Sequence, residues 1–136
     1  MMDATTDALA KKLRLTPETR LLALNAPDPY VEALREAGVA VSLAPIGEGD
    51  TYDAVHSFVR SQEEAELALT SASAALESGG VFWIMWPKKT SGVPTNLTRD
   101  SLAALALAQS WGPVSNVSID ATWSALRLRR RPDVEE

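Results

Sequence analysis

The amino-acid sequence predicts a three-layer α/β fold, in which a mostly parallel sheet of about six strands lies between helical layers and ends in an antiparallel hairpin. Apolar, strand-like segments alternate along the chain with segments of helical periodicity. The first strand is almost continuously apolar, as expected for a strand that is covered on both faces. The last two strands are joined only by residues 120–121, a link so short that it permits only antiparallel pairing.

Five elements are predicted in the first half of the chain. The second helix has clear end signals, because Asp28 suits its N-cap, Pro29 suits its first position and Gly38 suits the position just after its end. A short Gly-Glu-Gly-Asp loop separates the second strand from the third. The predicted elements are an amphipathic helix over 3–14, strands over 20–25, 39–45 and 53–59, and the helix over 29–37.

The second half is predicted to contain two helices and three strands. Ser61 and Glu64 form a capping-box pattern at the start of one helix, Gly79 and Gly80 end it, and Thr98 suits the N-cap of the other. The helices are expected over 61–77 and 98–110, and the strands over 81–86, 114–119 and 122–130. Residues 1–130 are therefore expected to form one domain, followed by a charged, flexible tail over 131–136.

Composition excludes several classes of function. The chain has 136 residues, 46% of them hydrophobic and 23% charged, which is typical of an ordinary globular domain. Its net charge of −5 argues against general binding to DNA or to anionic membranes, since both require a basic face. The absence of cysteine excludes disulfides, thiolate metal sites and a cysteine nucleophile. No secretory signal or membrane span is recognised, so a cytoplasmic location is expected.

Several parts of the sequence resemble known families. The β-α-β opening, the segment "ALESGGVFWIMWPKK" and the closing hairpin resemble the Rossmann-type fold of methyltransferases that depend on S-adenosylmethionine. The segments "WPKKTSGVPTNLTRD" and "VSNVSIDATWSALRLR" resemble a small bacterial family of unknown function with a degenerate methyltransferase-like fold. The resemblance implies a methyltransferase-like topology. Because the link between the second and third strands is short, one strand of that topology is expected to be missing.

The cofactor motifs implied by this resemblance are missing. Methyltransferases have a glycine-rich turn after the first strand, whereas this chain has Asn25-Ala26-Pro27-Asp28-Pro29. The prolines remove two amide donors, and Asp28, as N-cap, would repel an anionic ligand. The second strand ends in Leu43-Ala44-Pro45, with no acidic residue for a ribose before Glu48. No catalytic residue and no cofactor are therefore predicted. If S-adenosylmethionine binds in an altered pose, the candidate contacts are Asn25, Asp28, His56 and Trp86.

Cationic residues near the expected carboxyl ends of the strands form a second candidate site. Lys88 and Lys89, together with Arg99, are candidates for holding a carboxylate or phosphate, and the alternative is an ordinary solvated loop. Arg99 is expected to pair with Asp100 or Asp120.

The remaining polar and aromatic residues favour structural roles. His56 is expected to be a hydrogen-bonded interior residue, and a single histidine without cysteine makes a metal site improbable. Asp120 is expected to form the hairpin turn. Trp86 and Trp123 are expected in the core, with a shared pocket or a dimer face as alternatives. The arginines in the run 127–131 are expected to be solvated on an outer strand.

These patterns favour a non-catalytic binding or interaction module. Its expected partner is a second copy of the chain in a homodimer, an unknown small molecule or another protein. Two alternatives stay open. One is a minimal methyltransferase that binds S-adenosylmethionine in an altered pose, and the other is a protein that binds a small anion.

Overall fold

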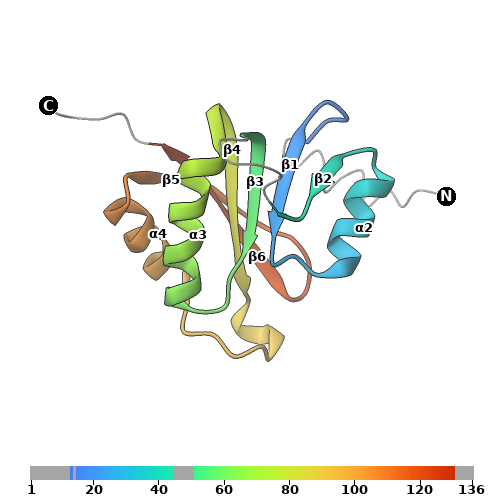
Figure 1. Ribbon diagram of the computed structural model, residues 1–136. Coiled ribbons are helices and arrows are strands. Elements are labelled where there is room, and N and C mark those ends of the chain that lie inside the picture. The colour runs from blue at the N-terminus through green and yellow to red at the C-terminus, as the bar shows by residue number, and fades with distance from the viewer. Residues whose placement is uncertain (1–12, 14, 45–50, 131–136) are drawn as a thin grey trace, which may run out of the picture.

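A computed structural model describes residues 13, 15–44 and 51–130 (Figure 1). The predicted helix over 3–14, the loop within 45–50 and the tail over 131–136 lie outside the described residues, apart from Leu13. The described elements are β1 (Arg20–Leu24), α2 (Asp28–Glu36), β2 (Ala40–Ser42), β3 (Tyr52–Phe58), α3 (Gln62–Ala75), β4 (Leu76–Pro87), the 3-10 helix η1 (Lys89–Ser91), α4 (Arg99–Ala108), β5 (Trp111–Ser118) and β6 (Trp123–Arg130). None of the described helices is long and apolar enough to cross a lipid bilayer.

The six strands form one sheet in the order β2-β1-β3-β4-β6-β5. The pairs β1–β2, β1–β3 and β3–β4 are parallel, whereas β6 pairs antiparallel with both β4 and β5. The predicted fold class is confirmed: the sheet is mostly parallel and carries an antiparallel hairpin at its C-terminal end.

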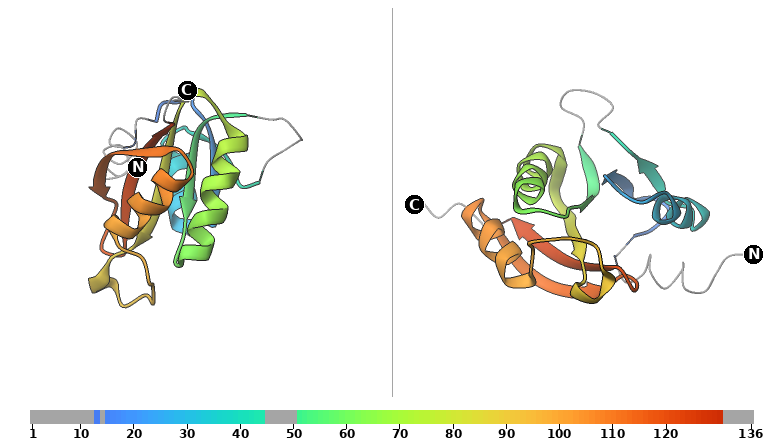
Figure 2. Two further views of the ribbon diagram at one scale, coloured as in Figure 1. Left: turned by 90° about the vertical axis from the view of Figure 1, so that its left-hand side faces the viewer. Right: turned by 90° about the horizontal axis from the view of Figure 1, so that it is seen from below.

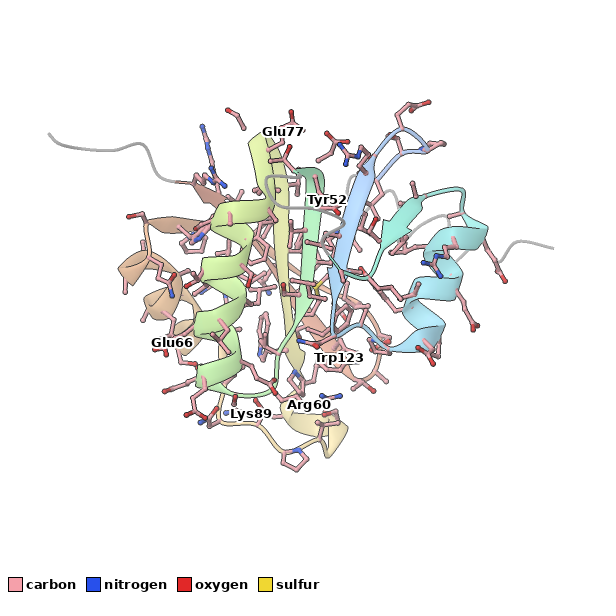
Figure 3. All side chains as sticks on the ribbon, viewed as in Figure 1. Tyr52, Arg60, Glu66, Glu77, Lys89 and Trp123 are labelled. Atoms are coloured by element: carbon pink, nitrogen blue, oxygen red, sulfur yellow. The ribbon has the colours of Figure 1, made fainter. Side chains whose placement is uncertain are left out.

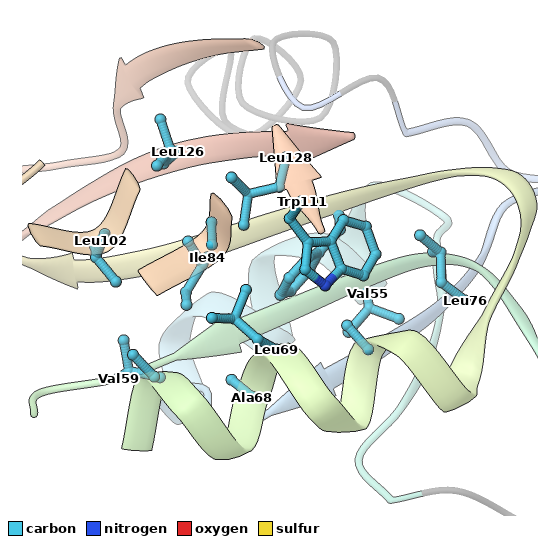
Figure 4. Packing of buried hydrophobic residues seen from close by; sticks show 14 of the residues in the cluster. Val55, Val59, Ala68, Leu69, Leu76, Ile84, Leu102, Trp111, Leu126 and Leu128 are labelled. Carbon is cyan, nitrogen blue, oxygen red and sulfur yellow. The ribbon is translucent and has the colours of Figure 1, made fainter. Parts of the chain in front are cut away.

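Two clusters of buried side chains cover the two faces of this sheet. The larger cluster joins α3 and α4 to the sheet, and Trp111 lies at its centre next to Leu69 and Leu128 (Figure 4). The second cluster joins α2, through Tyr30 and Leu34, to the other face. Figure 2 shows α3 and α4 beside each other and α2 on the opposite side of the sheet. The predicted three-layer arrangement is therefore present.

The amino end of α2 differs from the prediction. The N-cap is Pro27, no side chain caps the helix, and Asp28 is already its first residue. The expected N-cap role of Asp28 is therefore wrong. Pro29 favours the first turn of a helix because its ring fixes its own φ, but a proline at the second helical position fits that turn as well as one at the first.

The predicted caps of the other two helices are present in the structure. The hydroxyl of Ser61 accepts a hydrogen bond from the Glu64 amide at 3.1 Å, although the Glu64 carboxylate bonds the amide of Arg60 rather than that of Ser61. Thr98 and Ser101 form a complete capping box at the start of α4.

The start of β4 is the main departure in the centre of the sheet. Helix α3 ends at Ala75, and Gly79 and Gly80 lie inside β4 rather than ending the helix. Tyr52 pairs with Leu76 and Ala54 pairs with Val81, so residues 77–80 stand opposite Asp53 alone and bulge out of the ladder. A turn signal such as Gly-Gly does not distinguish a helix end from a bulge.

The position of β6 corrects a second expectation. Strand β5 begins at Trp111 rather than Val114 and forms the edge of the sheet, so β6 and its arginines lie on an interior strand instead of an outer one. The hairpin order allowed either strand to be outermost, and only the pairing with β4 decides between them.

Gly80 is required by close packing, and its neighbour provides a matched control. A Cβ added at Gly80 would lie 2.8 Å from the Asp53 carbonyl oxygen and 2.9 Å from that of Glu77, whereas one added at Gly79 would meet nothing within 4 Å.

We expect Gly80→Ala to lower the free energy of unfolding by about 2 kcal/mol. Gly79→Ala should lose only about 1 kcal/mol, because its cost is the positive φ of 81° alone. Urea unfolding of both variants measures the difference, and equal losses would contradict the packing argument.

Candidate functional site

The connection between β1 and α2 offers few groups to a ligand. Asn25 has a φ of 58°, in the left-handed region where glycine is most common. The amides of Tyr30 and Val31 both donate to the Pro27 carbonyl, at 3.1 and 3.2 Å, and Pro29 has no amide hydrogen. The Asp28 side chain is exposed and does not cap the helix, although its carboxylate still lies in the first turn of α2. The turn is closed by its backbone instead.

A buried polar pair lies beside this turn. The Tyr30 hydroxyl and Nδ1 of His56 are 2.8 Å apart, and His56 is completely buried. Burial lowers the pKa of His56 from 6.5 to about 3, so the ring is neutral at physiological pH. Burial, and secondarily the charge of Asp120, raises the pKa of Tyr30 above its usual value. The expectation of a hydrogen-bonded interior histidine is confirmed.

Aromatic side chains fill the carboxyl edge of the sheet on the α2 side. The Phe58 ring packs edge-on against Tyr30 at 4.8 Å and against Trp123 at 4.9 Å between centroids. The Arg60 guanidinium lies over the Trp123 ring, 5.5 Å from its centroid. Asp120 forms the expected turn, because its carboxylate accepts the amides of Thr122 and Trp123 at 2.8 Å each.

The loop after β4 closes the same edge on the α3 side. Thr95 donates its hydroxyl to the Arg60 carbonyl at 2.7 Å, and the Asn96 side chain accepts the Gln62 amide at 3.2 Å. The first turn of α3 is therefore capped by side chains of the chain itself. Figure 3 shows Arg60, Lys89 and Trp123 together at this end of the sheet, and Glu77 at the other.

The three predicted anion-binding cations are only partly brought together. The Lys88 ammonium donates to the Ser118 hydroxyl, and the Arg99 guanidinium donates to the Asn116 side chain at 3.4 Å. Asn116 and Ser118 are two residues apart on β5 and share one face, so Lys88 and Arg99 approach the same side of this strand. Arg99 also pairs with Asp100 at 3.5 Å, as predicted, whereas Lys89 is exposed in η1.

The two tryptophans lie on opposite faces of the sheet. Trp86 belongs to the cluster under α3 and α4, and Trp123 belongs to the cluster under α2. Both are core residues, as expected, and the alternative of a pocket that they share is wrong. His56 and Trp86 are buried, which leaves Asn25 and Asp28 as the exposed candidates for contact with a cofactor.

A cavity of about 360 Å³ lies at the opposite, amino edge of the parallel strands. It is lined by the start of β4 (Leu76, Glu77, Gly79 and Gly80), by Val114 of β5 and by residues 127–130 of β6. This cavity was not predicted from the sequence, because the arginines were expected on an outer strand and the glycines at a helix end. Within the described part of the chain, no cluster of three His, Asp or Glu side chains could hold a metal ion.

Comparison with solved structures identifies the fold. A SAM dependent methyltransferase from Aquifex aeolicus matches with a TM-score of 0.69 and 9% sequence identity, over 93% of this chain and 93% of that chain. The TehB-like SAM-dependent methyltransferase from Corynebacterium glutamicum matches with a TM-score of 0.58 and 13% identity, over 95% and 89% of the two chains. No family model matches the sequence, and a search of curated proteins gives no match.

The protein therefore has a methyltransferase-like Rossmann fold. The fold does not determine the reaction, because the 4+2 cyclase SpnF also matches, with a TM-score of 0.62, 13% identity and coverage of 93% of this chain and 80% of that chain. At these identities the likeness extends to the fold alone.

The neutral His56 predicts a specific pH dependence of stability. The unfolded chain takes up a proton at His56 as the pH falls below 6.5, whereas the folded chain does so only near pH 3, so stability falls with pH inside this window. Between about pH 7 and about pH 5 the residue should cost the fold about 2 kcal/mol.

Urea unfolding at several pH values measures this loss. His56→Asn keeps a polar atom near Tyr30 but cannot titrate, and it should remove about 2 kcal/mol of the pH dependence over the same range. Identical pH profiles for the two proteins would show that His56 is not responsible.

Proposed function

We propose that this protein is a non-catalytic binding or interaction module of the cytoplasm, built on a methyltransferase-like fold. The observation that carries the proposal is the connection between β1 and α2. Its prolines lack amide hydrogens, and the amides of Tyr30 and Val31 in the first turn of α2 are already bonded to the Pro27 carbonyl. A ligand approaching this turn finds few donors.

The packing around the turn supports the same proposal. Ligands of open α/β sheets bind beyond the carboxyl ends of the strands. Here Tyr30, Phe58 and Trp123 fill this edge on one side, and the Thr95 and Asn96 hydrogen bonds close it on the other. Chain length does not contribute to the argument, because the chain spans 93% of the Aquifex methyltransferase.

The alternative is a minimal methyltransferase that binds S-adenosylmethionine in an altered pose. The methyltransferase neighbours favour this alternative through their fold. Asn25 and Asp28 would then contact the cofactor, since both are exposed at the turn and Asn25 already has the positive φ that glycine often supplies.

Calorimetry with S-adenosylmethionine distinguishes the non-catalytic module from the minimal methyltransferase. If the protein is a non-catalytic module, millimolar cofactor should give no heat of binding, while a known methyltransferase under the same conditions serves as the positive control. Micromolar binding that is lost in an Asp28→Ala variant would contradict the proposal and support the altered pose.

A second copy of the chain is the partner that we propose for the module. Edge strand β5 is poorly suited to sheet extension, because Pro113 lacks an amide hydrogen and the pairing with β6 is irregular between Pro113 and Ser115. The helical layer instead has exposed leucines, since the Leu67 side chain of α3 is 69% exposed and that of Leu107 on α4 is 45% exposed.

Light scattering should give a mass twice that of the 14.6 kDa monomer, and the double variant Leu67→Glu, Leu107→Glu should have the mass of the monomer. A monomeric unmodified chain would contradict the dimer.

Binding of a small anion at the carboxyl edge is the third proposal. Lys88 and Arg99 approach the same face of β5 through Ser118 and Asn116, and Lys89 is exposed nearby in sequence. Its test is a Lys88→Ala, Lys89→Ala double variant, used in the titration described below.

A further inference from the structure

We propose that the cavity at the amino edge of the parallel strands binds a small molecule through its phosphate group. This site lies at the opposite end of the sheet from the turn between β1 and α2. The proposal goes beyond the proposed function and does not depend on it, because a chain that also bound S-adenosylmethionine would keep the same cavity.

The size of the cavity suits a small ligand. Its volume of about 360 Å³ falls within the range of about 300–1,000 Å³ that is usual for small-molecule pockets. The cavity lies where β4 begins and β6 ends, so its walls come from adjacent strands of a hydrogen-bonded sheet.

The charge of the lining selects an anion. Arg127, Arg129 and Arg130 are among the residues that line the cavity, and Glu77 is the one acidic residue of the lining. Because side chains alternate across β6, Arg127 and Arg129 project from one face of the strand and Arg130 from the other. A guanidinium presents parallel N–H groups that match two oxygens of a phosphate. The net charge of the whole chain is −5, which opposes a polyanion such as RNA and favours a single small molecule that fits inside the cavity.

Arg130 is held in place by the fold. Its Nη2 atom donates to the carbonyls of Ser73 at 2.7 Å and Leu76 at 3.0 Å, and the guanidinium lies 5.5 Å from the centroid of the Trp111 ring. These bonds use one terminal nitrogen, so Nη1 and Nε do not take part in them. The group is thus a pre-positioned positive charge at the cavity wall.

The bulge at the start of β4 brings irregular main chain to the cavity wall. Residues 77–80 stand outside the regular ladder, and Gly79 has a φ of 81° with open space where a side chain would be. Successive amides around a left-handed residue can converge on an anion. The space beside Gly80 is filled by the chain itself, since a side chain there would collide with Leu76 and with two carbonyl oxygens, so the open side of the bulge is at Gly79.

Titration of the isotope-labelled protein with inorganic phosphate, followed by amide chemical shifts at constant ionic strength, tests the proposal. The amides of Gly79 and Gly80 should shift saturably at millimolar phosphate. Arg129→Gln removes an exposed guanidinium and should weaken binding about fivefold. Glu77→Gln removes the opposing charge and should tighten binding about threefold.

Arg35→Gln, which removes an exposed guanidinium from α2, is the matched control, and its affinity for phosphate at Gly79 and Gly80 should equal that of the unmodified chain. A spectrum otherwise unchanged in each variant confirms that the fold is intact. The proposal is overturned if Gly79 and Gly80 do not respond, or if Arg129→Gln binds phosphate as well as the unmodified chain does. It is equally overturned if the phosphate response of Gly79 and Gly80 is lost in the Lys88→Ala, Lys89→Ala double variant and kept in Arg129→Gln, because the anion would then bind at the carboxyl edge.

Discussion

Strand β4 is hydrogen-bonded on both sides, and the rest of the structure depends on this double pairing. It pairs in parallel with β3 and antiparallel with β6, and its residues 82–86 are all buried. Because side chains alternate across a strand, Phe82 and Ile84 pack under α3 and α4 while Trp83 and Met85 pack under α2. One strand therefore joins the two hydrophobic clusters. A shift of its register by one residue would exchange the two sets of side chains between the faces.

The two ends of the sheet have different properties as a result. At the carboxyl end, where such folds usually bind ligands, the Phe58 and Trp123 rings pack against each other, and the Asn96 side chain accepts the Gln62 amide at the start of α3. At the amino end, the irregular start of β4 prevents close packing between β4 and the end of β6 and leaves a cavity with a positive lining. The same strand thus takes part in a densely filled edge at one end of the sheet and in an open edge at the other.

Local chemistry was enough to predict most of the elements and the order of helices and strands. Thr98 and Ser61 cap helices because the signal and its hydrogen bond lie within four residues of each other. His56 was also interpreted correctly, since a lone histidine within an apolar strand rarely has another role.

Features that depend on distant pairing were not predictable in this way. The bulge at Gly79 and Gly80 follows from the register of β4 against β3, and the interior position of β6 follows from its pairing with β4. The cavity needs both features, so the candidate site at the amino edge could not be predicted from the sequence.

The interior position of β6 has a consequence for synthesis on the ribosome. The chain makes β5 before β6, yet β6 is the strand that lies between β5 and β4. While translation continues, one long side of β4 therefore has no strand to pair with, and β5 cannot dock until the last strand has emerged. Unpaired strand edges promote association between nascent chains. The sheet is thus complete only after β6 has left the ribosome, and until then the unpaired side of β4 is the part of the sheet that most needs protection by chaperones.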